Sequence, residues 1–251
     1  MPPNPTRGPM AVSGELALYD HLVAENTEGN MRFVLFCIAL GLLTAMTTPS
    51  MAAYGGLILI PTADTTGKDE YSVSLGNQGP THAPNLDSRY LNTEIGIGDR
   101  FETGIDFDLS KGGDTAAATN FKYAFLTDPK LGLFMAAGIG SVDEGVKPQP
   151  FLVATQCLRL GRIHFGGIRT EQRNRWFVGA DTSFSDKWTF MADYVSGDEN
   201  GSSLGMNYQV NDNFGACIGL EHPNADGAEV SYVLEFVFGG SFRKGHRSEG
   251  E

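Results

Sequence analysis

The chain has 251 residues, 41% of them hydrophobic, and a formal net charge of -12. This size suits one domain with an ordinary core. The acidic balance argues against nucleic acid as a partner, because phosphate binding needs clustered lysine and arginine. After residue 52, no continuously apolar stretch reaches the roughly 18 residues of a membrane-spanning helix, so the sequence predicts none.

Residues 31–52 read MRFVLFCIALGLLTAMTTPSMA. One positive charge at Arg32 precedes an apolar run and then small residues, an order typical of a secretory signal peptide cleaved after Ala52 or Ala53. A buried helix is the alternative. Residues 1–30 are proline-rich and then polar, and we interpret them as an unstructured leader or a mis-assigned start.

Residues 53–69 contain GGLILIPTA and do not fit the strand count that follows. As a further spanning strand, this stretch would put the N-terminus outside the cell. We expect a short segment at the periplasmic mouth of a barrel or inside its lumen. The remaining alternative is an extra strand of a barrel with a different count.

From Glu70 onward, alternating segments of bilayer-spanning length recur along the chain. The expected strands lie near 70–78, 88–98, 101–110, 115–126, 131–140, 150–160, 162–169, 175–184, 187–196, 202–210, 213–221 and 228–238. Tight links alternate with mostly longer ones, so both ends of the series fall on the side of the short turns. Short periplasmic turns and longer external loops are typical of an outer-membrane barrel.

The hairpin at 93–109, TEIGIGDRFETGIDFDL, shows the alternation most clearly. A period of two places apolar and aromatic side chains on one face, and glycine and carboxylates on the other. A soluble sandwich would bury the apolar face against a second sheet, whereas a barrel turns it toward lipid. Strand length and the signal peptide favour the barrel. The predicted fold class is all-β: a transmembrane antiparallel up-and-down β-barrel of about 12 strands at 70–238, with 10 or 14 as alternatives and 239–251 as a tail.

One acid-rich set of side chains is expected to face the lumen. The predicted pore-lining residues are Glu94, Glu102, Asp106, Asp108, Lys122, Asp181, Asp193, Glu221 and Glu235, and Glu229 is also placed inward. Rings of carboxylates favour cations in pores. The alternative is that these carboxylates pair with arginine or lysine and simply fill a narrow barrel. The strand phase at 150–169 stays open, because Gln156 and Arg159 cannot both face inward.

Catalytic chemistry has little support in the sequence. A hydrolase would need a serine within reach of a histidine that a third polar group orients. His164 lies on an expected strand, but no serine neighbours it in the sequence. We therefore assign no catalytic residue, cofactor or metal site, and we interpret Cys157 and Cys217 as isolated thiols.

The expected last strand, AEVSYVLEFVF, is amphipathic and closes on aromatic residues. It resembles the C-terminal signal that the barrel-assembly machinery recognises in bacterial outer-membrane proteins. This resemblance implies that machinery as a partner, although residues 239–251 follow the strand.

The N-terminal stretch carries a second resemblance. Gly56-Leu57-Ile58, then Ile60-Pro61-Thr62-Ala63, Gly67 and Tyr71-Ser72-Val73 resemble the start of YjbH-like outer-membrane proteins, which are linked to exopolysaccharide export. The region 94–106 is similar to an early hairpin of that family. The resemblance implies a barrel and partners among polysaccharide-secretion proteins.

These observations predict a Sec-exported barrel in contact with the lipid of a diderm outer membrane. The leading functional hypothesis is a porin-like passive channel for small, cationic solutes. The second is a non-conducting structural or polysaccharide-export-accessory barrel. The third is a lipid-modifying enzyme, for which His164 is the one candidate.

Overall fold

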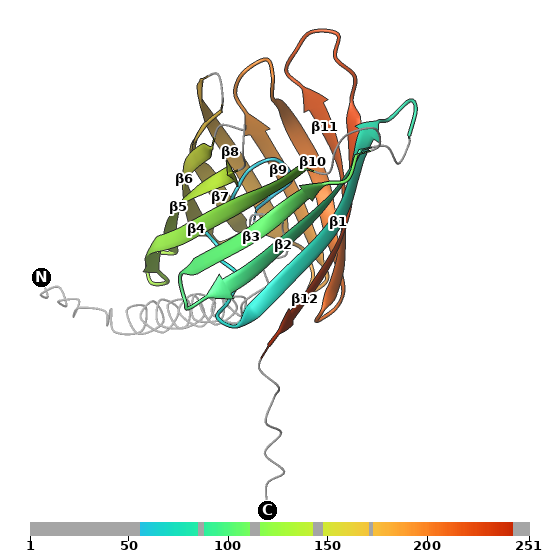
Figure 1. Cartoon of the computed structure of the whole chain (residues 1–251). Helices are drawn as coiled ribbons and strands as arrows, with labels where there is room; N and C mark the ends of the chain where they lie inside the picture. Colours follow the sequence, from blue (N-terminus) through green and yellow to red (C-terminus); the bar gives the residue numbers. More distant parts are fainter. Residues whose placement is uncertain (1–55, 85–87, 111–115, 143–147, 171–172, 243–251) are drawn as a thin grey trace, which may run out of the picture. The chain divides into compact units, whose positions relative to one another are not determined.

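The structure is a computed structural model that describes residues 56–84, 88–110, 116–142, 148–170 and 173–242 (Figure 1). These residues belong to one compact unit, Pro49–Glu251. The predicted leader and signal peptide lie outside the described residues, as does most of the tail. Within the described ranges, no helix has the length and apolar character needed to cross a membrane.

Twelve antiparallel strands close into a barrel, which confirms the predicted fold class (Figure 1). The strands are β1 (Glu70–Pro80), β2 (Arg89–Ile97), β3 (Phe101–Asp108), β4 (Ala116–Asp128), β5 (Leu133–Val142), β6 (Gln149–Leu158), β7 (Gly161–Arg169), β8 (Asn174–Ser183), β9 (Trp188–Val195), β10 (Gly201–Asn211), β11 (Phe214–Pro223) and β12 (Ser231–Ser241). Each strand pairs with its neighbours in the chain, and β1 pairs with β12.

The pairing of β1 with β12 removes the two sheet edges that an open sheet would have. Lipid offers no hydrogen bonds to unpaired backbone groups, so only a closed sheet can span a bilayer. β12 continues to Ser241 rather than ending at residue 238, because Tyr71 and Glu70 take Gly240 and Ser241 as partners. The strands therefore occupy 70–241, which extends the expected barrel into the tail.

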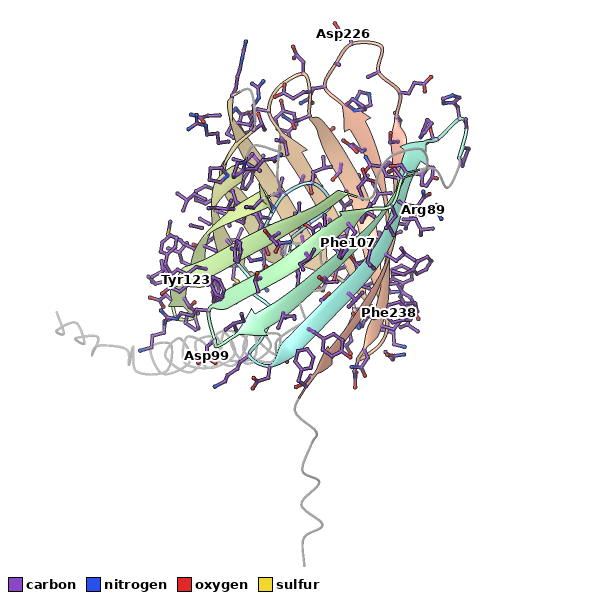
Figure 2. All side chains as sticks on the ribbon, viewed as in Figure 1. Arg89, Asp99, Phe107, Tyr123, Asp226 and Phe238 are labelled. Carbon is purple, nitrogen blue, oxygen red and sulfur yellow. The ribbon has the colours of Figure 1, made fainter. Side chains whose placement is uncertain are left out.

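Short links alternate with mostly longer ones around the barrel. The links that follow β2, β4, β6, β8 and β10 have two to four residues, and they lie at what we name the short-turn end. The other links have four to eight residues and lie at the long-loop end. Figure 2 shows Asp99 in the turn after β2 and Asp226 in a loop at the opposite end. Gly98 begins that turn with φ of 70°, a left-handed conformation that glycine adopts without strain.

Large apolar side chains cover the outside of the barrel. Those at least 40% exposed include Leu75, Ile95, Ile105, Phe121, Tyr123, Phe125, Leu152, Phe165, Trp176, Val178, Leu204, Ile218, Leu220 and Phe238. Aromatic rings also contact one another across neighbouring strands: Trp188 and Tyr208 are tilted against each other, and Phe214 stacks on Phe238. A closed barrel with such a surface is suited to lipid on all sides.

The structure resolves the phase of β6 and β7. Val153 and Thr155 face inward from β6 and are fully buried, as is His164 on β7. Gln156 instead donates to the carbonyl of Leu131 at the short-turn end. Arg159 lies in the turn between the two strands. Neither Gln156 nor Arg159, the two residues that left the strand phase open, therefore points into the lumen.

Candidate functional site

The interior of the barrel holds most of the residues predicted to line a pore. Buried in it are Glu94, Glu102, Lys122, Asp181, Asp193 and Glu235. Asp106 and Glu221 are half-buried, and Asp108 is exposed at the long-loop end of β3. Glu229 precedes β12 in an exposed loop, where it lies 3.1 Å from His82, so its predicted inward position is wrong.

Residues 56–66, which we name the inner segment, occupy part of the lumen. Leu57 N donates to Ile60 O at 2.9 Å, and Gly56 bridges to Pro61, so the segment begins with a tight turn. From that turn the chain crosses the barrel interior to reach the start of β1. Figure 1 shows this stretch inside the ring of strands.

Asp193 on β9 holds the tip of the turn. Its Oδ2 atom accepts hydrogen bonds from Ile58 N at 2.9 Å and Leu59 N at 3.0 Å, and its Oδ1 atom accepts one from the Ser203 hydroxyl. Backbone amides buried away from water need such partners. Farther along, Ala63 N donates to Thr155 Oγ1 at 3.0 Å. Strand side chains thus replace the sheet hydrogen bonds that this turn lacks.

Inward-facing glycines make room for the apolar side chains of the turn. A Cβ at Gly179 would lie 2.6 Å from Ile60 Cδ1 and 2.7 Å from Leu57 Cδ1. A Cβ at Gly219 would lie 2.7 Å from Ile58 Cδ1, and one at Gly205 would lie 2.6 Å from the same atom. The wall formed by β8, β10 and β11 therefore fits the turn closely, as packing in a protein core does.

A buried ion pair meets the other end of the inner segment. Lys122 Nζ lies 2.7 Å from Glu102 Oε1, and both side chains are almost fully buried. Thr66 N donates to Glu102 Oε2 at 2.7 Å, and its hydroxyl lies 3.5 Å from Glu94 Oε2. These carboxylates are engaged with lysine and the inner segment, as the alternative of a filled barrel expects.

A second charged cluster surrounds Arg162 on β7. Its guanidinium lies 2.6 Å from Asp64 of the inner segment and 2.6 Å from Asp181 on β8. His164 Nε2 lies 3.2 Å from Asp181 Oδ2, and His164 Nδ1 lies 2.9 Å from Thr155 Oγ1. The sequence predicted Asp181 as an inward acid but did not predict Arg162 as an inward base, because it left open which side chains of residues 150–169 face the lumen.

Thr155, His164 and Asp181 form the chain of hydroxyl, imidazole and carboxylate that hydrolases use. Both Thr155 and His164 are 0% exposed, however, and the hydroxyl already accepts a hydrogen bond from Ala63 N. The chain of hydrogen bonds therefore links the barrel wall to the inner segment rather than facing a substrate. Among the described residues, no group of three or more His, Cys, Asp or Glu is placed to hold a metal ion.

The other half of the lumen retains a cavity of about 350 Å³. Leu57–Pro61 of the inner segment form one side of this cavity. The long-loop halves of the strands form most of its remaining wall. Its polar lining residues are Gln78, Tyr90, Asn92, Asp106, Gln149, Cys217 and Glu235, and its apolar strand residues include Phe151, Ile168 and Val233. Asp106 accepts a hydrogen bond from Asn120 at 3.0 Å. Nearby, Gln78 donates to Glu221 at 2.5 Å.

No protein-family model and no curated protein matches the sequence. Among solved structures, the KdgM porin aligns with a TM-score of 0.51 at 10% identity over 68% of this chain and 99% of that one. The NanC porin aligns at 0.47 with 10% identity over 67% and 98%. The Acinetobacter baumannii outer membrane protein Omp33 aligns at 0.46 with 12% identity over 68% and 98%.

The likeness to the KdgM porin concerns the fold, since so few residues are identical. Together with the closed sheet and the apolar outer surface, it identifies the chain as an outer-membrane β-barrel with a porin-like fold. No match tests the resemblance of the N-terminal stretch to YjbH-like proteins, which stays a prediction.

Proposed function

We propose that the protein is a porin-like channel that takes small cationic solutes into the long-loop half of its lumen. One observation carries this proposal. The cavity of about 350 Å³ has Asp106 and Glu235 as its charged lining side chains, and no lysine or arginine stands among its described lining residues. Carboxylates in a narrow, partly desolvated passage attract cations and repel anions.

The geometry also sets an expectation for the size of the passage. External loops of outer-membrane barrels are the longer ones, so the cavity faces the cell exterior. The inner segment occupies the lumen between this cavity and the short-turn end, where Glu102, Lys122 and Arg162 are held in ion pairs. We therefore expect small unitary currents rather than those of a wide pore.

The test is planar-bilayer conductance of the refolded chain, beginning at residue 53, under a salt gradient. The expected result is discrete small steps with a reversal potential on the cation side. The D106N/E235Q variant should lose most of this preference, whereas E229Q, which changes one charge outside the lumen, should keep it. Anion preference, or unchanged selectivity in the double variant, would refute the cationic assignment.

A non-conducting barrel is the second candidate, and the inner segment favours it. Its hydrogen bonds to Asp193, Thr155 and Glu102 and its ion pair with Arg162 bind it to several strands at once. Protein that shows heat-modifiable gel mobility, and is therefore folded, would then be electrically silent.

A silent barrel would act through partners. The resemblance to YjbH-like proteins implies polysaccharide-secretion proteins, and the last strand implies the barrel-assembly machinery during insertion. Pull-downs from native outer membranes would recover envelope proteins under this second proposal, and recovery of none would count against it.

A further inference from the structure

We propose that the cavity beside the inner segment is a binding site for primary alkylammonium compounds, with Glu235 as the residue that holds the ammonium group. The inference deepens the proposed function and rests on the same cavity. A cation-selective channel needs only negative charge along its path. This proposal requires in addition a saturable site, with one carboxylate that binds the ammonium group and an apolar surface that contacts the rest of the ligand.

Glu235 has the position and the unmet bonding capacity that such a site requires. It lies on β12, lines the cavity and is 9% exposed. Its Oε1 atom accepts no hydrogen bond from a described residue within 3.5 Å. A buried carboxylate oxygen without a donor is costly, and its presence in a folded protein calls for an explanation.

The neighbours of Glu235 supply hydroxyl, thiol and phenol groups, and no lysine or arginine stands among the described residues that line the cavity. Ser74 on β1 lies near this carboxyl, and its buried hydroxyl makes no hydrogen bond with a described residue. Cys217 pairs with Glu235 in register from β11, and Gly76 does so from β1. A Cβ at Gly76 would collide with the Tyr90 ring, so this glycine makes room for the Tyr90 phenol beside the strand position of Glu235. An ammonium group carries three N–H donors and fits this set of acceptors.

The remainder of the cavity suits a short apolar chain. Leu57, Ile58 and Ile60 of the inner segment face it, and Phe151 and Val233 line it from the strands. Ligand sites of about 300–1,000 Å³ are usually apolar with a few placed polar groups, and this cavity of about 350 Å³ lies at the lower end of that range. A neutral alcohol would bury the same chain but leave the carboxylate unpaired, and a carboxylic acid would place two like charges together.

The experiment is ligand-observed NMR titration of the folded chain in detergent micelles with hexylammonium, hexanol and hexanoate. The three probes share one apolar chain, so uptake by micelles is measured separately with protein-free samples. Hexylammonium should bind saturably, hexanol at least about ten-fold more weakly, and hexanoate without saturation. Equal binding of the three probes, or tighter binding of hexanoate, would overturn the proposal. This comparison needs no variant and so does not depend on how a variant folds.

Variants then assign the anchor. E235Q keeps the shape of the side chain but removes its charge, and it should weaken hexylammonium binding at least about ten-fold. E229Q makes the same change in an exposed loop and should bind like the unmodified chain. Heat-modifiable gel mobility confirms that each variant is folded. Undiminished binding by folded E235Q would overturn the assignment.

The outcome separates this site from the channel. Cation-selective steps without saturable hexylammonium binding would leave the channel standing and remove the site. Saturable binding that needs Glu235 in an electrically silent barrel would establish the site and remove the channel.

Discussion

The carboxylate of Asp193 accepts a hydrogen bond from the backbone nitrogen of Ile58, 135 positions earlier in the chain, at 2.9 Å. The same Oδ2 atom accepts one from Leu59 N at 3.0 Å. Such long-range bonds fix a turn that has no strand partner. Asp193 was predicted as a pore-lining acid, and the structure makes it the residue that holds the tip of the inner segment in the lumen.

Replacing Asp193 should loosen this tip in a graded way. D193A removes all three acceptor contacts and should lower the free energy of unfolding by about 1.5–3 kcal/mol, the usual range for hydrogen bonds to a charged group. D193N keeps an oxygen for the two amides, and the Ser203 hydroxyl can turn to accept from the new NH₂, so its loss should be smaller. Urea unfolding in lipid vesicles measures both variants.

The matched control for this series is D212A, because Asp212 is exposed in the turn between β10 and β11. It should leave unfolding unchanged. In planar bilayers D193A should also show larger or noisier currents, since the tip is freed. Identical stability and conductance in D193A and the unmodified chain would show that Asp193 does not hold the segment.

The strands could be predicted from the sequence because their signal is local. The hairpin at 93–109 alternates strictly, and its turn and its two faces follow from residues within a few positions of one another. For residues 53–69 the sequence left three positions open, the periplasmic mouth, the lumen and an extra strand. It could not choose among them, because the partners Asp193, Thr155 and Glu102 are distant in sequence and become neighbours only when the barrel closes. For the same reason the sequence left open whether the acids faced an open pore or were paired.

Because Ile58 packs closely against Gly219, we expect the I58V substitution to destabilise the unmodified chain but to stabilise a G219A variant. G219A would bring its Cβ to about 2.7 Å from Ile58 Cδ1 and should cost about 1–3 kcal/mol of stability by overpacking. I58V deletes that Cδ1 atom and should cost about 0.5–1.5 kcal/mol on its own. In the G219A background, however, I58V should stabilise the protein, because it removes the clash.

A double-mutant cycle by urea unfolding measures this coupling. G167A serves as the control, because a Cβ at Gly167 meets only Arg175 O at an ordinary 3.4 Å. It should show no coupling to I58V. Additive effects of G219A and I58V would mean that the turn does not contact this wall.

Breaking the buried pair of Lys122 and Glu102 should destabilise the barrel strongly. K122M leaves the Glu102 carboxylate buried, with Thr66 N still donating to it at 2.7 Å, and the loss of one partner of a buried ion pair costs about 3–5 kcal/mol. Adding E102Q removes the uncompensated charge and should recover part of this loss. K130M, in the exposed turn after β4, should have little effect. A K122M chain that unfolds like the unmodified one in urea would contradict a structural role for the pair.

The loop after β9 should respond to acid in a defined range. Arg175 binds Glu199 through two hydrogen bonds of 2.6 and 2.7 Å, and this contact lowers the pKa of the Glu199 carboxyl. Because the folded pKa is lowered, the pair contributes above the ordinary glutamate pKa of about 4.3 and is lost as pH falls through the lowered value. NMR titration of the Glu199 carboxyl carbon should therefore give a midpoint below that of R175M. Equal midpoints would show that the pair does not form in solution.

Locking the inner segment decides whether it must move for current to flow. Ala63 N lies 3.0 Å from Thr155 Oγ1, so cysteines at these two positions are close enough to test for a disulfide. The variant A63C/T155C is made with C157S and C217S, since both native cysteines are free. If solutes pass only when the segment shifts, oxidation should abolish conductance and a reductant should restore it. Conductance that is equal in both redox states, with the disulfide verified by mass spectrometry, would mean that solutes pass beside a fixed segment.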